Sequence, residues 1–134
     1  MTVAEARIMH VSIDVAWRTV YDFASRPENM RLWAAGLAAG LTAVGDGWTG
    51  DGGPLGQIRV DFVPRNDFGV IDHDVTLPDG RKVHIAFRIL PNIDGAEAVF
   101  TLIRQADMND AAFEADAAAV RADLETLKSV LEKR

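Results

Sequence analysis

Apolar and polar positions near the start of the chain change from strand-like to helix-like spacing. Residues Arg7–Asp14 alternate between apolar and polar side chains, as a partly two-faced β-strand does. Four apolar residues then recur at helical spacing: Trp17, Val20, Tyr21 and Ala24. The short carboxylate of Asp14 is placed to accept hydrogen bonds from the first backbone amides of that helix. The pattern therefore predicts a strand followed directly by a short helix.

A second short helix is predicted after a break at Ser25-Arg26. Pro27 suits the first turn of a helix because that position needs no N–H donor, and Glu28 lies near the positive end of the helix dipole. The apolar face of this helix consists of Met30, Trp33, Ala34 and Leu37. Gly36 and Gly40 are expected to end it.

From Leu41 onward the apolar positions follow period two or form short runs between turns, which is typical of β-strands. Five strands are predicted: Leu41–Trp48, Leu55–Val63, Gly69–Leu77, Arg81–Leu90 and Ala96–Gln105. The glycine-rich segment Thr49–Pro54 is predicted to be a loop. Asp79-Gly80 and Asp94-Gly95 carry the Asp-Gly signal of two-residue hairpin turns, so the strands are expected to form an antiparallel sheet.

The last predicted element is a helix of about 20 residues, which Asn109 or Asp110 caps and which ends at Glu132. Its apolar stripe steps by four and three residues: Phe113, Ala117, Val120, Leu124, Leu127 and Leu131. The order β-α-α-β5-α predicts an α+β fold, in which a curved antiparallel sheet of about six strands wraps around the C-terminal helix. The two short helices are expected to close one end of the sheet.

The composition predicts one soluble globular domain, residues 1–134. Hydrophobic residues make up 49% of the chain and charged residues 25%, and a chain of this length can form one core without disulfides. The sequence holds no cysteine, which excludes disulfides, thiolate nucleophiles and thiolate metal sites. We find no signal-peptide pattern and no run of the roughly 20 apolar residues that a membrane span needs. A cytoplasmic protein that does not insert into membranes is therefore expected.

The charge balance argues against nucleic acid as a partner. Twenty acidic and fourteen basic residues give a net charge of −6, and adjacent basic residues occur only at Arg81-Lys82 and Lys133-Arg134. Binding to a duplex or to an anionic membrane surface needs clustered Lys and Arg. Gly45–Gly50 matches the spacing G-x-G-x-x-G, but the residues after it cannot begin a helix. We interpret this segment as a hairpin loop rather than a phosphate site.

Segments at both ends of the chain resemble one superfamily. Val11–Phe23 is similar to the strand-to-helix entrance of the SRPBCC superfamily, Arg26–Trp33 to its second helix, and Phe113–Glu132 to its closing helix. This superfamily includes START domains, polyketide cyclases/dehydrases and plant pathogenesis-related allergens, and the order of elements is that of its helix-grip fold. The resemblance covers essentially the whole chain. It implies an apolar cavity between the sheet and the last helix, where members bind lipids, steroids, polyketides or hormones, or catalyse cyclisation and dehydration.

Hairpin geometry predicts which side chains share a face of the sheet. Two-residue turns at both Asp-Gly pairs would pair Val75 with His84 and Ile89 with Phe100. The inward face, chosen for its larger aromatic and aliphatic surface, would carry Val70, Asp72, Asp74, Ile85, Phe87, Ile89, Phe100, Leu102 and Arg104. The outward face would carry Ile71, His73, Val75, His84, Arg88, Val99, Thr101 and Ile103. A slip of one residue would exchange the two faces.

This register makes Asp72 and Arg104 the polar groups expected among apolar side chains. A carboxylate in such a place has a raised pKa unless it is paired, so Asp72, with the adjacent His73, is a candidate for acid–base catalysis. Arg104 or Arg88 is a candidate for holding an oxyanion or a ligand carboxylate. The alternative is an Asp–Arg ion pair that only stabilises the sheet. The predicted ligand-binding residues are Trp33, Phe62, Phe87, Arg88, Phe100, Leu102 and Arg104.

The histidines do not indicate a metal site, which leaves three candidate functions. His73 and His84 lie on neighbouring predicted strands, but a third ligand is missing and Arg88 lies beside them, so no metal site is expected. No cofactor is expected either. The favoured function is binding of a hydrophobic small molecule by a carrier or sensor. The alternatives are an enzyme of the polyketide cyclase/dehydrase type, and a protein-interaction module with a collapsed cavity. A homodimer that uses the outward face of the sheet is a further hypothesis.

Overall fold

The computed structural model describes residues 2–134, which form one β-sheet, two α-helices and three short 3-10 helices. The strands are β1 (Ala6–Ile13), β2 (Leu41–Val44), β3 (Gly47–Asp51), β4 (Gln57–Phe62), β5 (His73–Thr76), β6 (Lys82–Asn92) and β7 (Gly95–Ile103). The α-helices are α1 (Trp17–Ala24) and α2 (Asp110–Glu132). The 3-10 helices are η1 (Pro27–Leu32), η2 (Ala35–Leu37) and η3 (Gly53–Leu55).

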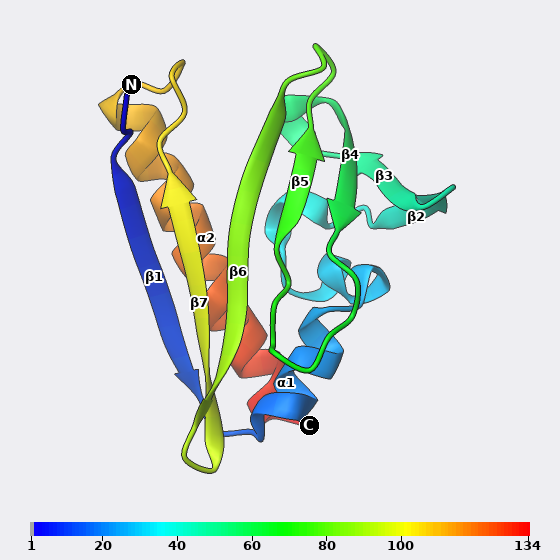
Figure 1. The fold of residues 1–134 in the computed structure, drawn as a ribbon, viewed down its shortest axis with the longest axis vertical. Coiled ribbons are helices and arrows are strands. Elements are labelled where there is room, and N and C mark those ends of the chain that lie inside the picture. The colour runs from blue at the N-terminus through cyan, green and yellow to red at the C-terminus, as the bar shows by residue number, and fades with distance from the viewer. Residues whose placement is uncertain (1) are drawn as a thin grey trace.

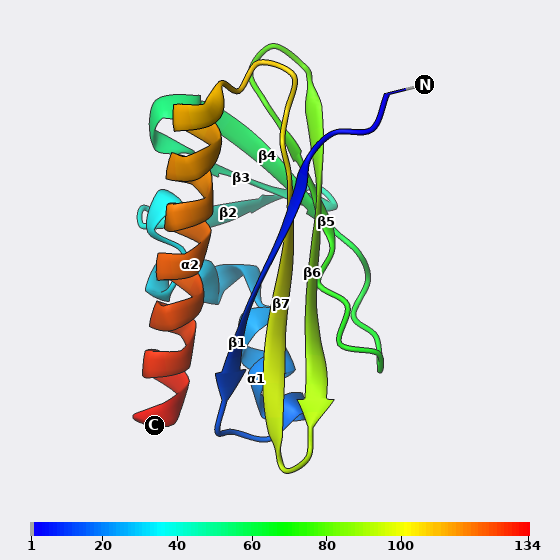
Figure 2. The same cartoon turned by 90° about the vertical axis from the view of Figure 1, so that its left-hand side faces the viewer.

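Within residues 2–134 the seven strands form one antiparallel sheet in the order β1-β7-β6-β5-β4-β3-β2. The first strand therefore lies beside the last one, while all other neighbours in the sheet are consecutive in the sequence (Figure 1). Figure 2 shows α2 running along one face of the sheet. The predicted α+β arrangement is confirmed, with one strand more than expected.

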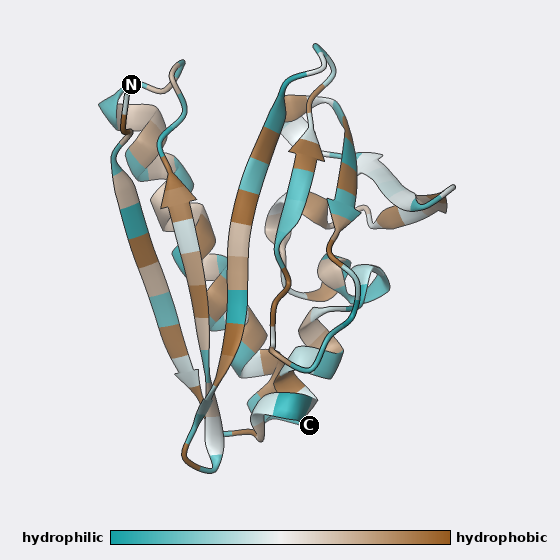
Figure 3. Ribbon diagram, viewed as in Figure 1, coloured by the Kyte–Doolittle hydropathy of each residue, from teal (hydrophilic) through white to brown (hydrophobic). Residues whose placement is uncertain are grey.

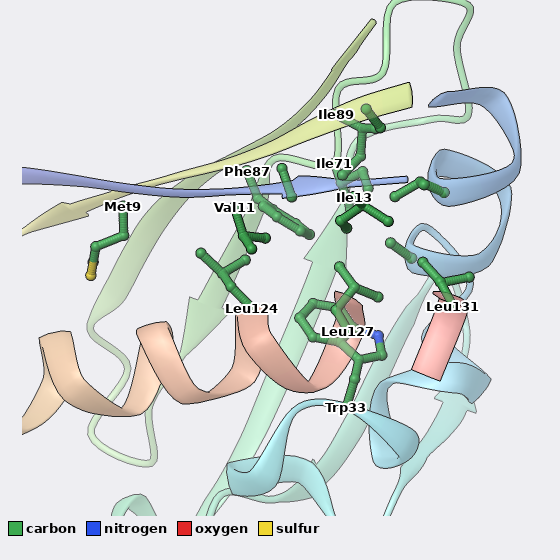
Figure 4. Packing of buried hydrophobic residues seen from close by; sticks show 14 of the residues in the cluster. Met9, Val11, Ile13, Trp33, Ile71, Phe87, Ile89, Leu124, Leu127 and Leu131 are labelled. Carbon is green, nitrogen blue, oxygen red and sulfur yellow. The ribbon is translucent and has the colours of Figure 1, made fainter. Parts of the chain in front are cut away.

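The core lies between α2 and the sheet. Figure 4 shows Met9, Val11 and Ile13 of β1 on the side of the strand that faces Leu124 and Leu127 of α2. The buried residues of α2 repeat as the predicted stripe does: Phe113, Ala117, Leu124, Leu127 and Leu131. Brown and teal segments alternate along β6 in Figure 3, so one face of this strand is apolar. Burying each large aliphatic side chain stabilises the fold by about 1.5–3 kcal/mol.

The predicted N-cap residues of the two α-helices have different outcomes. The side chain of Asn109 accepts a hydrogen bond from the N–H of Ala112 at 2.8 Å, so the predicted cap of α2 is confirmed. The predicted cap of α1 is wrong, because Ala16 occupies the N-cap position. Asp14 instead donates its backbone N–H to a carboxylate oxygen of Glu132 at 2.8 Å, which ties the start of α1 to the end of α2.

The predicted second helix is two separate 3-10 turns. η1 begins at Pro27 as expected, but the backbone of Ala34 is extended, with φ −98° and ψ 101°, and separates η1 from η2. This interruption places Trp33 between the two turns, where its side chain is buried against the core. The tighter 3-10 geometry lets this short segment change direction between α1 and β2.

The glycine-rich residues 45–51 form the turn between β2 and β3 and the strand β3 itself. β2 and β3 are joined by a turn at Gly45-Asp46, and Gly45 has φ 58°, a left-handed conformation that glycine adopts without strain. Thr49–Asp51, predicted as loop, belongs to β3. Gly50 is required there because a Cβ at this position would lie 2.8 Å from the carbonyl oxygen of Gly40. The glycines thus serve a tight turn and a close backbone approach, and the prediction of one strand over Leu41–Trp48 is wrong.

The register of two hairpins also differs from the prediction. Thr76 pairs with Lys82, so five residues, Leu77–Arg81, connect β5 to β6 instead of a two-residue Asp-Gly turn. This shift of one residue exchanges the two faces of β5 relative to β6. In the next hairpin the turn is Ile93-Asp94, a shift of two residues, which leaves the faces of β6 and β7 as predicted.

Candidate functional site

Two adjoining cavities of about 250 Å³ each lie between α2, the inner face of the sheet and the η segments. The first, which we call the Trp33 cavity, is lined by Trp33, Phe62, His73, Phe87 and Asp123 among others. The second, the Met108 cavity, is lined among others by Leu77, Arg81, Leu102, Met108 and Asp116. The residues common to both are Leu55, Val75, Ile85, Phe100 and Val120.

The apolar residues predicted to bind a ligand all reach these cavities. Trp33, Phe62 and Phe87 line the Trp33 cavity, Leu102 lines the Met108 cavity, and Phe100 lines both. The ring of Phe87 lies 5.7 Å from the ring of Trp33 and 5.9 Å from that of Phe100, measured between centroids. Tilted rings at such spacings pack favourably. These three side chains, from the segment between η1 and η2, from β6 and from β7, therefore form one continuous aromatic wall.

Trp33 also brings an unused hydrogen-bond donor to this wall. Trp33 is only 8% exposed, and its Nε1 is buried without a partner among residues 2–134. A buried donor that lacks a partner costs about 1–3 kcal/mol. A polar atom of a bound ligand, or a water molecule, could satisfy this N–H.

His73 lies on the cavity side of the sheet, whereas the predicted register placed it outside. Its ring packs on Phe62 at a centroid distance of 5.0 Å, and its Nδ1 lies 2.9 Å from the carbonyl oxygen of Ile71. Because a carbonyl oxygen only accepts, Nδ1 carries the proton and Nε2 keeps its lone pair. Burial lowers the pKa of His73. The cavity therefore contains a neutral imidazole with one basic nitrogen.

Asp72 lies away from the cavities, contrary to the prediction. Its Oδ1 accepts the backbone N–H of Phe87 at 3.0 Å, and its Oδ2 accepts from Nη2 of Arg88 at 2.8 Å. Burial alone would raise the pKa of Asp72, but the hydrogen bonds from Arg88 and Phe87, with the Arg88 charge, lower it overall. The wrong register is the reason for the error, because it assigned Asp72 and Arg88 to opposite faces. The structure shows the ion pair that was the alternative interpretation, with Arg88 in place of Arg104.

Arg104 is likewise not free to hold a ligand. Its Nε donates to the carbonyl oxygen of Met108 at 3.1 Å, and its Nη1 lies 2.9 Å from Asp110. Its guanidinium also lies over the ring of Phe113, 5.6 Å from the centroid. Arg104 therefore fastens the end of β7 to the start of α2, and Arg88 is engaged by Asp72. Neither arginine is among the residues that line the two cavities.

Two carboxylates at the cavities were missed by the sequence analysis. Asp116 lines the Met108 cavity and Asp123 lines the Trp33 cavity, both from α2. Burial raises the pKa of both side chains, although the N–H of Ala35, which donates to Asp123 at 3.1 Å, partly offsets this for Asp123. With Val120 these residues are spaced by four and three, as the apolar stripe is. That spacing was a usable signal, because it places acidic residues beside the buried face of the helix.

His84 and Asp74 form a pair on the outer side of the sheet. Nδ1 of His84 lies 2.7 Å from Oδ1 of Asp74, and both side chains are substantially exposed. The inner position of His73 separates the two histidines by the thickness of the sheet. Within residues 2–134, no group of three His, Cys, Asp or Glu side chains is arranged to hold a metal ion. No helix in this part of the chain is both long enough and apolar enough to cross a membrane.

Comparison with known proteins finds likeness at the level of structure. No family model and no curated protein matches the sequence. DynU16, a protein of the dynemicin biosynthetic locus, superposes with a TM-score of 0.73 at 11% identity, over 95% of this chain and 47% of its own. This chain thus spans about half the length of DynU16. CalU16 from Micromonospora echinospora gives a TM-score of 0.69 at 11% identity, over 96% of this chain and 74% of its own.

A third solved structure is matched over nearly its full length. The Aha1 dimer from Colwellia psychrerythraea gives a TM-score of 0.71 at 14% identity, covering 96% of both chains. The fold is the helix-grip fold. Identities this low establish the fold alone, so the function has to be argued from the cavities.

Proposed function

We propose that this helix-grip protein binds an apolar small molecule in the Trp33 and Met108 cavities. The observation that carries the proposal is the pair of adjoining, mostly apolar cavities of about 250 Å³ each beneath α2. Protein interiors are otherwise close-packed, and voids larger than a water molecule are few in a domain. Ligand sites are typically apolar cavities with a few polar groups that orient the ligand. Here those groups include Trp33 Nε1, His73, Asp116 and Asp123.

The proposal is tested by filling the space that the two cavities share. Val120 lines both, so Val120→Phe should occlude them and weaken binding of a neutral fluorescent probe, N-phenyl-1-naphthylamine, by about tenfold or more. Ala118→Phe adds the same ring at an exposed position of α2 and serves as the matched control. A titration in which both variants bind the probe as tightly as the wild-type chain would refute the proposal.

A second candidate function is a cofactor-independent enzyme of the polyketide cyclase/dehydrase type. His73 favours it, because a neutral imidazole with a free Nε2 lines the Trp33 cavity together with Asp123. Nε2 would accept a proton from an acidic C–H or O–H of the substrate, and the resulting imidazolium would return that proton to a neighbouring atom of the substrate. Asp72, paired with Arg88, is a weak base, and its part here is to hold the strand that carries His73.

The two functions are separated by a variant of His73. His73→Gln keeps a hydrogen-bonding group of similar size but removes the titratable nitrogen. If the protein is an enzyme, this variant should keep binding the substrate while its turnover falls by about 100-fold or more. If it is a carrier, probe binding is retained and no turnover is found in either protein. The third candidate, an interaction module, requires a collapsed cavity, and the two cavities count against it.

A further inference from the structure

Asp116 and Asp123 give the two cavities a negative character that no cation offsets. Asp116 has no hydrogen bond or ion pair within the described part of the chain, although burial raises its pKa. Asp123 accepts only the backbone N–H of Ala35 at 3.1 Å within residues 2–134. An unpaired carboxylate in an apolar wall is costly, and a side chain of this kind is normally paired.

The basic groups around the cavities are already engaged or uncharged. Arg81, which lines the Met108 cavity, is bound to Asp79 at 2.9 Å and to Asp107 at 3.3 Å. His84 is hydrogen-bonded to Asp74 at 2.7 Å, and burial keeps His73 neutral. The net charge of the chain, −6, adds a field of the same sign. An anionic ligand would therefore be repelled, whereas a cation would supply the missing partner.

We propose that the ligand of these cavities is an apolar molecule that carries a protonated amine, and that Asp116 accepts its hydrogen bond. The inference rests on the proposed function, since it specifies the chemical class of the ligand at the same site. The apolar body would lie against the shared lining, around Phe100 and Val120, and the ammonium group would lie at Asp116. Asp123 lies two helical turns further along α2, about 10 Å away, and offers a weaker second contact.

The ammonium group is favoured over the other polar groups that an apolar molecule could carry. An alcohol can donate one hydrogen bond to Asp116 but leaves its charge uncompensated. Hydrogen bonds between ionised partners are shorter and about twice as strong as neutral ones. The low dielectric of a cavity increases this difference. Preference for the amine should therefore appear as a difference in affinity between molecules of equal shape.

The test compares three probes with one ring system, using isothermal titration calorimetry at neutral pH. The probes are 2-naphthylmethylamine, 2-naphthylmethanol and naphthalene-2-carboxylate. The inference predicts that the amine binds about tenfold or more tightly than the alcohol, and the alcohol more tightly than the carboxylate. Asp116→Asn should remove most of the preference for the amine while leaving the affinity for the alcohol unchanged. Asp123→Asn should reduce the preference by a smaller factor.

Glu125→Gln is the matched control, because it removes one negative charge from an exposed position of α2 that lines neither cavity. It should leave all three affinities unchanged. Equal affinities for amine and alcohol, tighter binding of the carboxylate, or an equal loss in Glu125→Gln would overturn the inference while the binding function stands. Failure of all three probes to bind the wild-type chain would overturn both. Even if a variant does not fold, the affinities of the three probes for the wild-type chain show whether the cavities prefer the amine.

Discussion

Asp72 and His73 are adjacent in the chain but lie in opposite environments. Asp72 is buried on the outer side of β5 and β6, where Arg88 and the N–H of Phe87 hold its carboxylate. His73 faces the Trp33 cavity and packs on Phe62. Successive residues of a strand point to opposite faces, so one of these side chains stabilises the sheet and the other is available to a ligand.

Asp72→Asn should destabilise the protein at neutral pH by about 1–3 kcal/mol, because it weakens the bonds to Arg88 and to a buried N–H. The pKa of Asp72 is lowered in the folded state, so its contribution is present above its unfolded pKa of about 3.9 and is lost as pH falls through the folded value. Urea unfolding across the acid range measures both effects. Asp67→Asn, at an exposed position, is the control. Equal stabilities of the two variants would contradict the assigned role of Asp72.

His73 should make the stability depend on pH near neutrality. Its pKa is lowered in the folded state, so the unfolded chain takes up a proton first as pH falls below about 6.5. Stability is therefore full above that pH and decreases below it. His73→Gln should flatten the dependence measured by urea unfolding between about pH 7.5 and 5.5. An identical slope in His73→Gln would show that the buried imidazole is not the source.

At the scale of elements, prediction from the sequence succeeded where the pattern is long and regular. The stripe from Phe113 to Leu131 repeats over the whole of α2, and the structure buries it. The alternation over Arg7–Asp14 likewise located β1, whose bounds are Ala6–Ile13. A period that persists over many residues averages out local exceptions, which is why the fold class was predictable.

The lengths of the turns, and with them the register of the strands, could not be predicted from the sequence. The register of β5 against β6 depends on whether their connection has an even or an odd number of residues. The Asp79-Gly80 signal predicted a two-residue turn, whereas the structure has five residues between Thr76 and Lys82. The resulting shift of one residue moved Asp72 out of the site and His73 into it. Asp116 and Asp123 were missed for a different reason, because the prediction for the C-terminal helix considered only its apolar stripe. The predicted apolar residues Phe87, Phe100 and Leu102 line the cavities, because a shift of two residues leaves the faces of β6 and β7 unchanged.

The turn of the β6–β7 hairpin contains a strained residue, Ile93, whose replacement should change the stability of the protein. Ile93 is 94% exposed and has φ 53°, a left-handed conformation that is unfavourable for a β-branched side chain. Ile93→Asn should raise the free energy of unfolding by about 1 kcal/mol, because asparagine tolerates this conformation. Ile93→Val retains the branching and should give no gain. A urea midpoint for Ile93→Asn at or below that of Ile93→Val would contradict the assigned strain.

At the scale of the whole molecule, the curved sheet and α2 separate enough to leave space between them. The end of α2 near Leu127 and Leu131 packs into the core beside β1 (Figure 4). The half near Asp116 and Val120 instead borders the two cavities. Buried residues along the whole helix thus contribute to the core, and the stretch from Asp116 to Leu124 also borders the space that can receive a ligand.

The location of a bound apolar molecule tests this account most directly. Intermolecular nuclear Overhauser effects, recorded between N-phenyl-1-naphthylamine and the methyl groups of the protein, report which surface the probe contacts. The account predicts contacts to Val75, Ile85 and Val120, which line both cavities. Contacts confined to Ile8 and Ile93, which are exposed and line neither cavity, would contradict it.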